Sequence, residues 1–164
     1  MRRIVLVSDT HMRPKILERV IELYPDVDDY LMCGDSSLPK KEIFNFESVQ
    51  GNHDYVNYPK EIIKDIEGNK ILMTHGHFQC IWPEHIEDLI SYAKGLKADV
   101  VFYGHTHIYM DEVIDGIRFI NPGSLFFNRD MSDPSFAYIE INGKNVTVKK
   151  ETIPYSENEI ERMY

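Results

Sequence analysis

The sequence is poor in cysteine. It contains two, Cys33 and Cys80, in a chain of 164 residues. Two thiols cannot form the several bridges that staple small secreted domains, and they are too few for a cysteine-rich structural zinc site. We therefore expect both to be free thiols in a reducing compartment, packed as small side chains.

Long hydrophobic runs are also missing. The apolar run nearest the N-terminus, residues 4–7, ends at Ser8 and Asp9. A signal-peptide core needs roughly 7 to 15 apolar residues and a membrane-spanning helix needs about 20. The sequence therefore predicts no membrane association, and we expect a cytoplasmic location.

Positive charge is scarce relative to negative charge. The chain has 18 lysines and arginines against 27 aspartates and glutamates, which gives a formal net charge of −9. An acidic surface repels extended polyanions, so we expect no stable binding of nucleic acid. Small phosphate esters are not excluded, because bound divalent cations would reverse the local field.

The apolar pattern of the first two-thirds of the chain predicts alternating strands and helices. Residues 3–7 are rich in β-branched side chains, which favours a strand buried on both faces. Helices are expected to begin at Pro14 and at Pro83-Glu84, each followed by apolar residues at helical spacing. Further strands are expected at residues 30–33, 47–50, 70–74 and 99–103.

The last third predicts antiparallel hairpins. Asp115-Gly116 and Asn142-Gly143 each separate two short apolar runs, as in two-residue hairpin turns. No linker divides the chain, so we expect a single α/β domain over residues 1–164, with mixed sheets between helices. The acidic tail after Pro154 is expected to be a solvated helix or a frayed end; it holds Glu157, Glu159 and Glu161.

Metal-binding residue types are concentrated at the predicted strand ends. Six of the seven histidines lie in four short segments, and only His85 lies elsewhere. Each segment follows a predicted strand, where the loops of an α/β sheet converge on ligands. The segments, with one further strand-end aspartate, are Asp9-Thr10-His11, Gly34-Asp35, Asn52-His53-Asp54, His75-Gly76-His77 and His105-Thr106-His107.

Imidazole and carboxylate together suit borderline divalent metals. A carboxylate such as Asp35 has two oxygens and could bridge two cations. Two metals roughly 3.5–4 Å apart can clamp the attacking and leaving oxygens of a displacement at phosphorus. Taken singly, each segment also fits a turn, a helix cap or a satisfied histidine pair. The recurrence at five strand ends favours the metal-site interpretation.

These motifs, in this order, resemble the calcineurin-like metallophosphoesterase superfamily. The short chain and segments 74–77, 103–107 and 121–124 resemble its small YfcE-type phosphodiesterase branch. The motifs run from residue 8 to residue 124. The resemblance implies two mixed β-sheets sandwiched between helices, in an αββα order, and two divalent transition-metal ions. We expect manganese, with nickel, iron, zinc or cobalt as alternatives.

The resemblance also implies a role for each motif residue. One metal would be held by Asp9, His11, Asp35 and His107, and Asp35 would bridge to a second held by Asn52, His75 and His105. His53 would assist catalysis over the phosphate, and Asp54 would orient its ring. In His75-Gly76-His77 either imidazole could be the ligand, and we choose His75 and give His77 a supporting position. The turn 121–124 would close the floor near the metals.

The expected reaction is hydrolysis of a small phosphodiester by direct attack of a metal-bridging hydroxide. The protein Ser/Thr phosphatases of this superfamily carry an arginine soon after Gly-Asp, whereas Ser36, Ser37, Leu38 and Pro39 follow Asp35 here. Without that cation to grip a phosphomonoester dianion, a diester preference is expected. The alternatives are a phosphomonoesterase or nucleotide phosphatase and a non-catalytic scaffold of the same fold. The resemblance is also compatible with a homo-oligomer.

Overall fold

The computed structural model describes residues 1–154, so the acidic tail with Glu157, Glu159 and Glu161 lies outside the described part. The described chain forms two five-stranded sheets. The first sheet has the order β10-β9-β1-β2-β3, and its strands are β1 (Arg2–Val7), β2 (Asp29–Met32), β3 (Glu47–Ser48), β9 (Ser135–Asn142) and β10 (Asn145–Thr152). The second sheet has the order β4-β5-β6-β8-β7, and its strands are β4 (Glu61–Ile66), β5 (Asn69–Thr74), β6 (Val100–Phe102), β7 (Tyr109–Ile114) and β8 (Ile117–Pro122).

Both sheets are mixed: the first carries an antiparallel hairpin at one edge only, and the second has antiparallel strands at both edges. In the first sheet β1, β2 and β3 are parallel, and β9 and β10 add an antiparallel hairpin. In the second, β5, β6 and β8 are parallel, and β4 and β7 pair antiparallel at the edges. This confirms the expected mixed sheets and both predicted hairpins.

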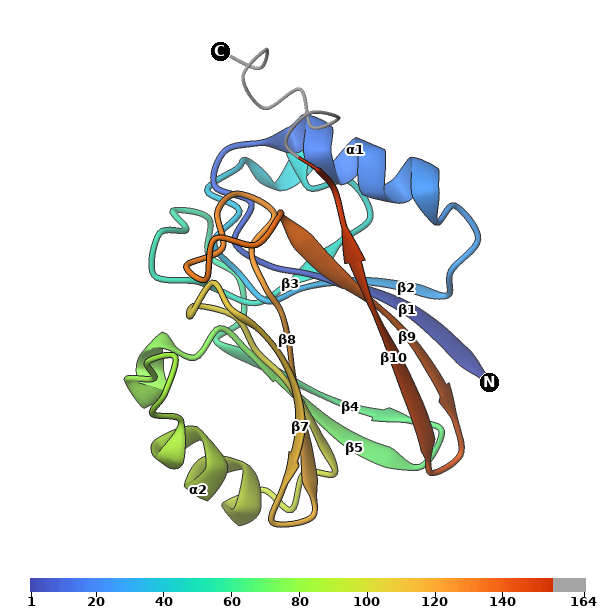
Figure 1. The fold of residues 1–164 in the computed structure, drawn as a ribbon, viewed down its shortest axis with the longest axis vertical. Helices are drawn as coiled ribbons and strands as arrows, with labels where there is room; N and C mark the ends of the chain where they lie inside the picture. The colour runs from blue at the N-terminus through green and yellow to red at the C-terminus, as the bar shows by residue number, and fades with distance from the viewer. Residues whose placement is uncertain (155–164) are drawn as a thin grey trace.

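Four layers result from the way the sheets and helices pack. In Figure 1, α1 (Pro14–Leu23) covers the outer face of the first sheet and α2 (Glu87–Gly95) lies against the second. Leu6 packs in the cluster between the sheets, while its neighbour Val5 packs in the cluster under α1. Because alternate side chains of a strand point to opposite faces, β1 is buried on both sides. The αββα order is therefore confirmed.

Two sequence-based expectations were wrong. The strand β4 was missed, although it pairs with all of β5 across the Glu67-Gly68 turn. The helix expected from Pro83-Glu84 begins at Glu87 instead. Those residues form a turn because the backbone groups of Trp82 and His85 bond to each other in both directions at 3.0 Å.

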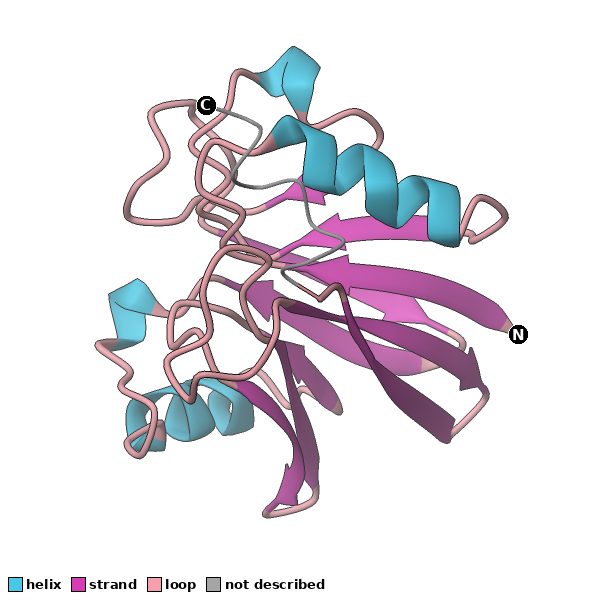
Figure 2. Ribbon diagram, turned by 45° about the horizontal axis from the view of Figure 1, so that its top comes forward, coloured by secondary structure: helices cyan, strands magenta, loops and turns pink. Residues whose placement is uncertain are grey.

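The parallel strands deliver their connecting loops to one end of both sheets. Figure 2 shows most of the long loops gathered beyond that end. Two short 3-10 turns, η1 (Lys40–Glu42) and η2 (His77–Gln79), lie within these loops. Within residues 1–154, no helix combines the length and apolar character needed to cross a membrane.

Candidate metal centre

The polar side chains singled out in the sequence follow five strands that end at the loop-rich edge. Because the carboxyl ends of β1, β2, β3, β5 and β6 point the same way, their loops meet over a common site. Seven of the side chains form two groups. The first ligand group is Asp9, His11 and His107, and the second ligand group is Asp35, Asn52, His75 and His105.

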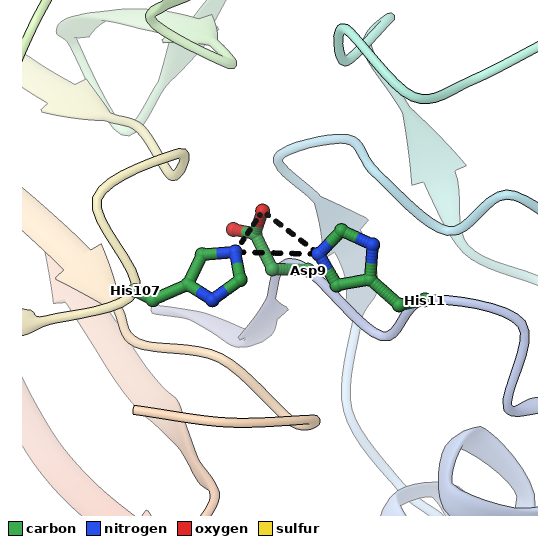
Figure 3. Close-up of side chains that lie close together, drawn as sticks. All are labelled: Asp9, His11 and His107. Atoms are coloured by element: carbon green, nitrogen blue, oxygen red, sulfur yellow. Dashed lines mark hydrogen bonds and ion pairs between the residues drawn. The ribbon is translucent and has the colours of Figure 1, made fainter. Parts of the chain in front are cut away.

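The first ligand group brings together residues nearly a hundred positions apart. Nε2 of His107 lies 3.1 Å from Oδ1 of Asp9 and 3.3 Å from Nε2 of His11. The same Asp9 oxygen is 3.7 Å from Nε2 of His11. Figure 3 shows these three atoms turned toward one another. Three potential donor atoms at such separations are suited to hold one cation.

The second ligand group is centred on His75. Nε2 of His75 lies 3.2 Å from Oδ2 of Asp35, 3.0 Å from Oδ1 of Asn52 and 3.2 Å from Nδ1 of His105. Ligand atoms of Asp9, Asp35 and His75 also lie within 4.8 Å of one another. Asp9 is therefore close to both groups, and the expectation that Asp35 bridges two metals stays a prediction.

Buried charge sets the electrostatics of the centre. Burial opposes ionisation of Asp9 and Asp35, but the pKa of each is lowered because the imidazole of His75 lies beside it. Burial also opposes the charge of His75, yet these two carboxylates raise its pKa to about 9. Burial and the neighbouring His75 lower the pKa of His105 to about 4. Two carboxylates held this closely in the interior require compensating positive charge.

Backbone carbonyls fix the orientation of two histidines. Nδ1–H of His75 donates to the carbonyl of Cys33 at 2.6 Å, and Nδ1–H of His107 donates to that of Phe127 at 2.9 Å. A carbonyl oxygen can only accept a hydrogen bond, so Nδ1 of each ring carries the hydrogen. The other ring nitrogen, Nε2, then faces the ligand group. This arrangement is typical of histidine ligands in metal sites.

The backbone is strained where it presents the ligands. Five of the seven candidate ligands adopt positive φ, a conformation that costs of order 1–3 kcal/mol for a residue with a side chain. The surrounding contacts must supply this energy, and such strain clusters at functional sites. The five are Asp9 (+56°), His11 (+43°), Asp35 (+57°), His105 (+69°) and His107 (+56°).

Two motif glycines are required by the close approach of ligand side chains. A Cβ at Gly51 would lie 2.0 Å from Oδ1 of Asp35. A Cβ at Gly104 would lie 2.1 Å from Oγ of Ser8 and 2.9 Å from Oδ2 of Asp9. The glycines that precede Asn52 and His105 therefore leave room for carboxylates from other strands.

His53 lies at the exposed rim of the centre, beside the first ligand group. Its ring centroid is 5.6 Å from that of His11, and its backbone N–H donates to Oδ1 of Asp35 at 2.8 Å. The ring of His77 lies 5.3 Å from that of His75 and 6.4 Å from that of His105. His77 thus borders the second ligand group, while the hydrogen bonds of that group involve His75.

Asp54 does not make the contact expected of it. Its carboxylate accepts backbone N–H groups from Gly51 (2.8 Å), Asp35 (2.9 Å) and Ser37 (2.9 Å). No hydrogen bond between Asp54 and the His53 ring occurs in the described structure. Instead of orienting an imidazole, Asp54 ties the loop after β3 to the loop after β2, because backbone donors from both loops converge on it.

Several supporting groups were not identified from the sequence. Ser8 donates from its hydroxyl to Oδ2 of Asp9 at 2.5 Å, and the carbonyls of Cys33 and Phe127 orient histidines. A serine beside an aspartate is too common to be informative, and a backbone carbonyl has no signature in the sequence. The turn at 121–124 was expected from the sequence to lie near the metals, and Ser124 donates a hydrogen bond to the carbonyl of Asp9 at 2.8 Å.

The donor set fits divalent metal ions. It combines carboxylate, imidazole and amide oxygen, which suit manganese, iron, nickel, cobalt and zinc. Within residues 1–154, the ion-pair partners of Asp9 and Asp35 are histidines, which are themselves metal ligands when neutral. Cations at the two groups would supply the positive charge that the buried carboxylates require.

Comparisons with known proteins agree with this interpretation. A model of the calcineurin-like phosphoesterase superfamily domain matches residues 1–144. A probable metallophosphoesterase of Bacillus subtilis, YsnB, is 31% identical over 150 residues, covering 89% of this chain and 88% of the relative. Phosphodiesterase MJ0936 of Methanocaldococcus jannaschii is 33% identical over 144 residues, covering 74% and 82%.

Solved structures show the same architecture. A predicted phosphoesterase from Streptococcus pneumoniae superposes with a TM-score of 0.83 at 30% identity, covering 92% of this chain and 89% of that chain. Vps29 from Entamoeba histolytica, solved in complex with Zn²⁺, superposes with a TM-score of 0.73 at 23% identity, covering 92% and 98%. At that identity the second likeness concerns the fold alone.

Proposed function

The chain belongs to the calcineurin-like phosphoesterase superfamily, and we propose that it is a two-metal phosphodiesterase that hydrolyses small phosphodiesters. The observation that carries the proposal is the convergence of two ligand groups on the buried carboxylate of Asp9, within reach of both. A single structural metal would need only one such group. Two adjoining groups favour a binuclear centre of the kind that cleaves phosphate esters.

We assign the ligands as the family motifs suggest. Asp9, His11, Asp35 and His107 would hold one ion, and Asn52, His75 and His105 would hold the other together with Asp35. Manganese is the ion we favour, with nickel, iron, zinc and cobalt as alternatives. When bound, two such ions would lower the pKa of water and stabilise the charge that develops at phosphorus.

His53 is the residue we propose for proton transfer. Its exposed ring lies beside His11 at the rim of the centre. Its backbone N–H donates a hydrogen bond to Asp35, which fixes the turn that contains His53. From this position the imidazole would donate a proton to the leaving alkoxide or stabilise charge on the phosphate. Asp54 would contribute indirectly by holding the same turn through its bonds to backbone N–H groups.

A diester preference is supported by the surroundings of Asp35. Ser37 and Ser36, which follow it, bond to Asp54, and no arginine stands in this loop. The arginine closest to His11 in sequence, Arg13, is only 6% exposed and stacks its guanidinium on the Phe126 ring at 4.0 Å. A phosphomonoester dianion is usually gripped by an accessible, bidentate arginine. We retain a phosphomonoesterase or nucleotide phosphatase as the alternative.

The expected partner is a small phosphate ester in the cytoplasm. The net charge of −9 disfavours long polyanionic substrates, because repulsion grows with each added phosphate. A scaffold role without catalysis is the further alternative, and the retained donor set and His53 argue against it. A homo-oligomer is compatible with the proposal.

The proposal is tested by metal reconstitution. Chelator-treated protein should hydrolyse bis(p-nitrophenyl) phosphate after addition of Mn²⁺, Ni²⁺ or Zn²⁺, and the stripped protein should not. Faster turnover of this diester than of p-nitrophenyl phosphate is expected. A preference for the monoester would favour the alternative, and no turnover of either ester with any metal would overturn the enzyme assignment.

Direct attack on phosphorus has its own stereochemical test. A diester made chiral at phosphorus with sulfur and isotopic oxygen should be hydrolysed with inversion, because one displacement occurs. Net retention would require two displacements and a covalent phosphoenzyme. That result would contradict the direct mechanism while leaving the metal centre intact.

A further inference from the structure

We propose that the loop of residues 124–128 is a positioning element for the first ligand group, so that the affinity of this group for a divalent cation depends on Ser124. The proposal rests on the proposed function, because it takes the first ligand group to be a metal site. It assigns a role to residues that bind neither metal nor substrate. Its consequence is that one half of the centre can be weakened more than the other.

The loop contacts every member of the first ligand group. The Ser124 hydroxyl donates to the carbonyl of Asp9 at 2.8 Å. The Phe126 ring lies edge-on to the ring of His11, with centroids 5.6 Å apart and planes at 66°. The carbonyl of Phe127 accepts Nδ1–H of His107 at 2.9 Å. Three residues within 124–127 therefore reach all three candidate ligands, two by hydrogen bonds and one by a ring contact.

Ser124 organises the loop as well as contacting Asp9. Its hydroxyl oxygen accepts the backbone N–H groups of Phe126 at 2.9 Å and Phe127 at 3.0 Å, and the residue is fully buried. One oxygen thus makes three hydrogen bonds, which is the full capacity of a hydroxyl group with one proton and two lone pairs. These bonds set the peptide planes that direct the Phe127 carbonyl at His107 and the Phe126 ring at His11.

The loop is anchored on its far side by buried polar groups. The Ser124 N–H donates to Oδ1 of Asn128 at 2.8 Å. Nδ2 of Asn128 donates to the carbonyl of Asp133 at 2.7 Å and to Oγ of Ser135 at 3.2 Å. Asn128 and Ser135 are fully buried. A buried network whose hydrogen bonds are all formed favours a single conformation. We therefore expect the loop to keep its contacts with the first ligand group instead of alternating between conformations.

The second ligand group is supported from elsewhere. His75 is oriented by the carbonyl of Cys33, and the turn of Asn52 is tied by Asp54. In the described structure, no hydrogen bond joins Ser124 to Asp35, Asn52, His75 or His105. Asp9 alone links Ser124 to the second ligand group, so loss of the Ser124 hydroxyl should disturb the first group more than the second.

The size of the effect follows from the role of supporting groups in metal sites. Removing a residue that orients a ligand typically weakens metal affinity by roughly 10- to 100-fold. Ser124→Ala removes three hydrogen bonds at once, and its effect should lie in this range for the first ligand group. Phe126→Leu keeps apolar bulk but removes the ring edge at His11, so a smaller weakening of the same site is expected.

The test measures Mn²⁺ binding to chelator-treated protein by titration calorimetry, with elemental analysis of the loaded protein. His75→Ala and His107→Ala identify the signals of the two sites, since each removes a ligand from one group. Ser124→Ala should weaken binding in the His75→Ala background, where the first group remains. It should weaken binding less in the His107→Ala background, where only Asp9 links Ser124 to the remaining group. Ser48→Ala, which removes another buried hydroxyl with a single bond to the Val49 carbonyl, is the matched control.

The outcomes separate this proposal from the proposed function. Absence of Mn²⁺ binding to the unaltered chain would overturn both. If Ser124→Ala bound two ions with the affinities of the unaltered chain, the positioning role would be overturned and the proposed function would stand. Equal weakening of both sites would have the same meaning. If Ser124→Ala does not fold, Phe126→Leu decides by the same measurement: weakening of the first site supports the proposal, and no site-specific change overturns it.

Discussion

The first ligand group is held by a loop distant in sequence, whereas the second is held by loops next to its own ligands. Each group combines buried and accessible members: Asp9, Asp35 and His75 are buried, His11, His107 and His105 are half-buried, and Asn52 is exposed. His11 exposes 21% of its side chain and His107 exposes 13%, while Asp35 and His75 expose at most 2%. The support of the first group comes from residues 124–127, more than a hundred positions from Asp9 and His11. The support of the second comes from Cys33 and Asp54, in loops next to its own ligands.

This difference assigns separate tasks to the two halves of the centre. The buried pair of Asp35 and His75 suits a tightly held ion, because desolvation strengthens the attraction of carboxylate for cation. The first group has the exposed His53 beside it, at a rim where a phosphate can approach from solvent. Substrate contact is therefore expected mainly at the first group, and charge compensation mainly at the second.

The largest effect should come from the residue that lies close to both groups. Asp9→Asn keeps the shape of a side chain that is fully buried but removes its charge. We expect loss of the ion of the first group and weaker binding at the second, because Asp9 also lies close to Asp35 and His75. Diester turnover should fall by roughly 10³-fold or more, because the several kcal/mol supplied by a complete metal pair are lost. Elemental analysis and the turnover assay measure this.

The control for this change is a carboxylate paired far from the centre. Asp111→Asn removes one partner of the Arg118 ion pair at the edge of the second sheet and should keep both ions. If Asp9→Asn retained two ions with unchanged affinities, Asp9 would be a ligand of neither group, and the assignment of the first group would be wrong.

The next effect concerns a residue that belongs to neither group. His53→Ala should retain both ions by elemental analysis and lose about 10²- to 10⁴-fold in turnover, the usual contribution of a proton-transfer residue. His85→Ala is the matched control, because His85 is an exposed histidine outside the centre. Equal turnover of His53→Ala and the unaltered chain would remove His53 from the mechanism.

A smaller effect, larger at the second group than at the first, is expected at Asp54. Asp54→Ala leaves the N–H groups of Gly51, Asp35 and Ser37 without their acceptor, at a cost of about 2–4 kcal/mol in the free energy of unfolding. The affinity of the second group should fall by roughly 10- to 100-fold, as for other supporting residues. Urea unfolding and titration calorimetry measure the two quantities.

Asp130 offers a matched control for Asp54. It too accepts bonds from a backbone N–H and a hydroxyl, both of Ser132, but within its own exposed turn. Asp130→Ala should change the unfolding free energy by less than about 0.5 kcal/mol, as is usual for surface positions. A larger loss of first-group than second-group affinity in Asp54→Ala would contradict the division of support between the groups.

Sequence patterns predicted which side chains lie together better than they predicted the groups that support them. The resemblance to the family placed Asp9, His11 and His107 at one metal, and the structure brings these three side chains together. The acceptors that orient His75 and His107 are backbone carbonyls, which any residue type supplies. Asp54 was assigned to the wrong partner, because its position beside His53 in sequence does not reveal that its carboxylate turns toward backbone groups.

Most of the fold was predictable because local patterns of apolar residues and turns indicate strands and hairpins. The prediction failed where a strand depends on a contact outside its own segment. Continuous apolar runs identified the buried strands β1 and β6, and Gly-containing turns identified two hairpins. The strand β4 was missed because Lys64 falls on the same face as Ile62 and Ile66 and interrupts the apolar alternation. Lys64 is accommodated there by an ion pair with Glu47 at 2.6 Å, a contact between the two sheets that no local pattern encodes.

The smallest effect is expected at Phe127, and it tests whether the first group is held by backbone rather than by side chains. Phe127 orients His107 through its carbonyl, and its own side chain is 41% exposed. Phe127→Ala keeps the carbonyl, so the Mn²⁺ affinity of the first group should change by less than about 3-fold, within the range of ordinary surface substitutions. Phe126→Leu, one residue earlier, should weaken the same site more, because that ring itself touches His11. If Phe127→Ala were the more damaging of the two, the exposed ring would have a role that the contacts of the loop do not explain, and the first group would depend on side-chain packing at the rim instead of the carbonyl beneath it.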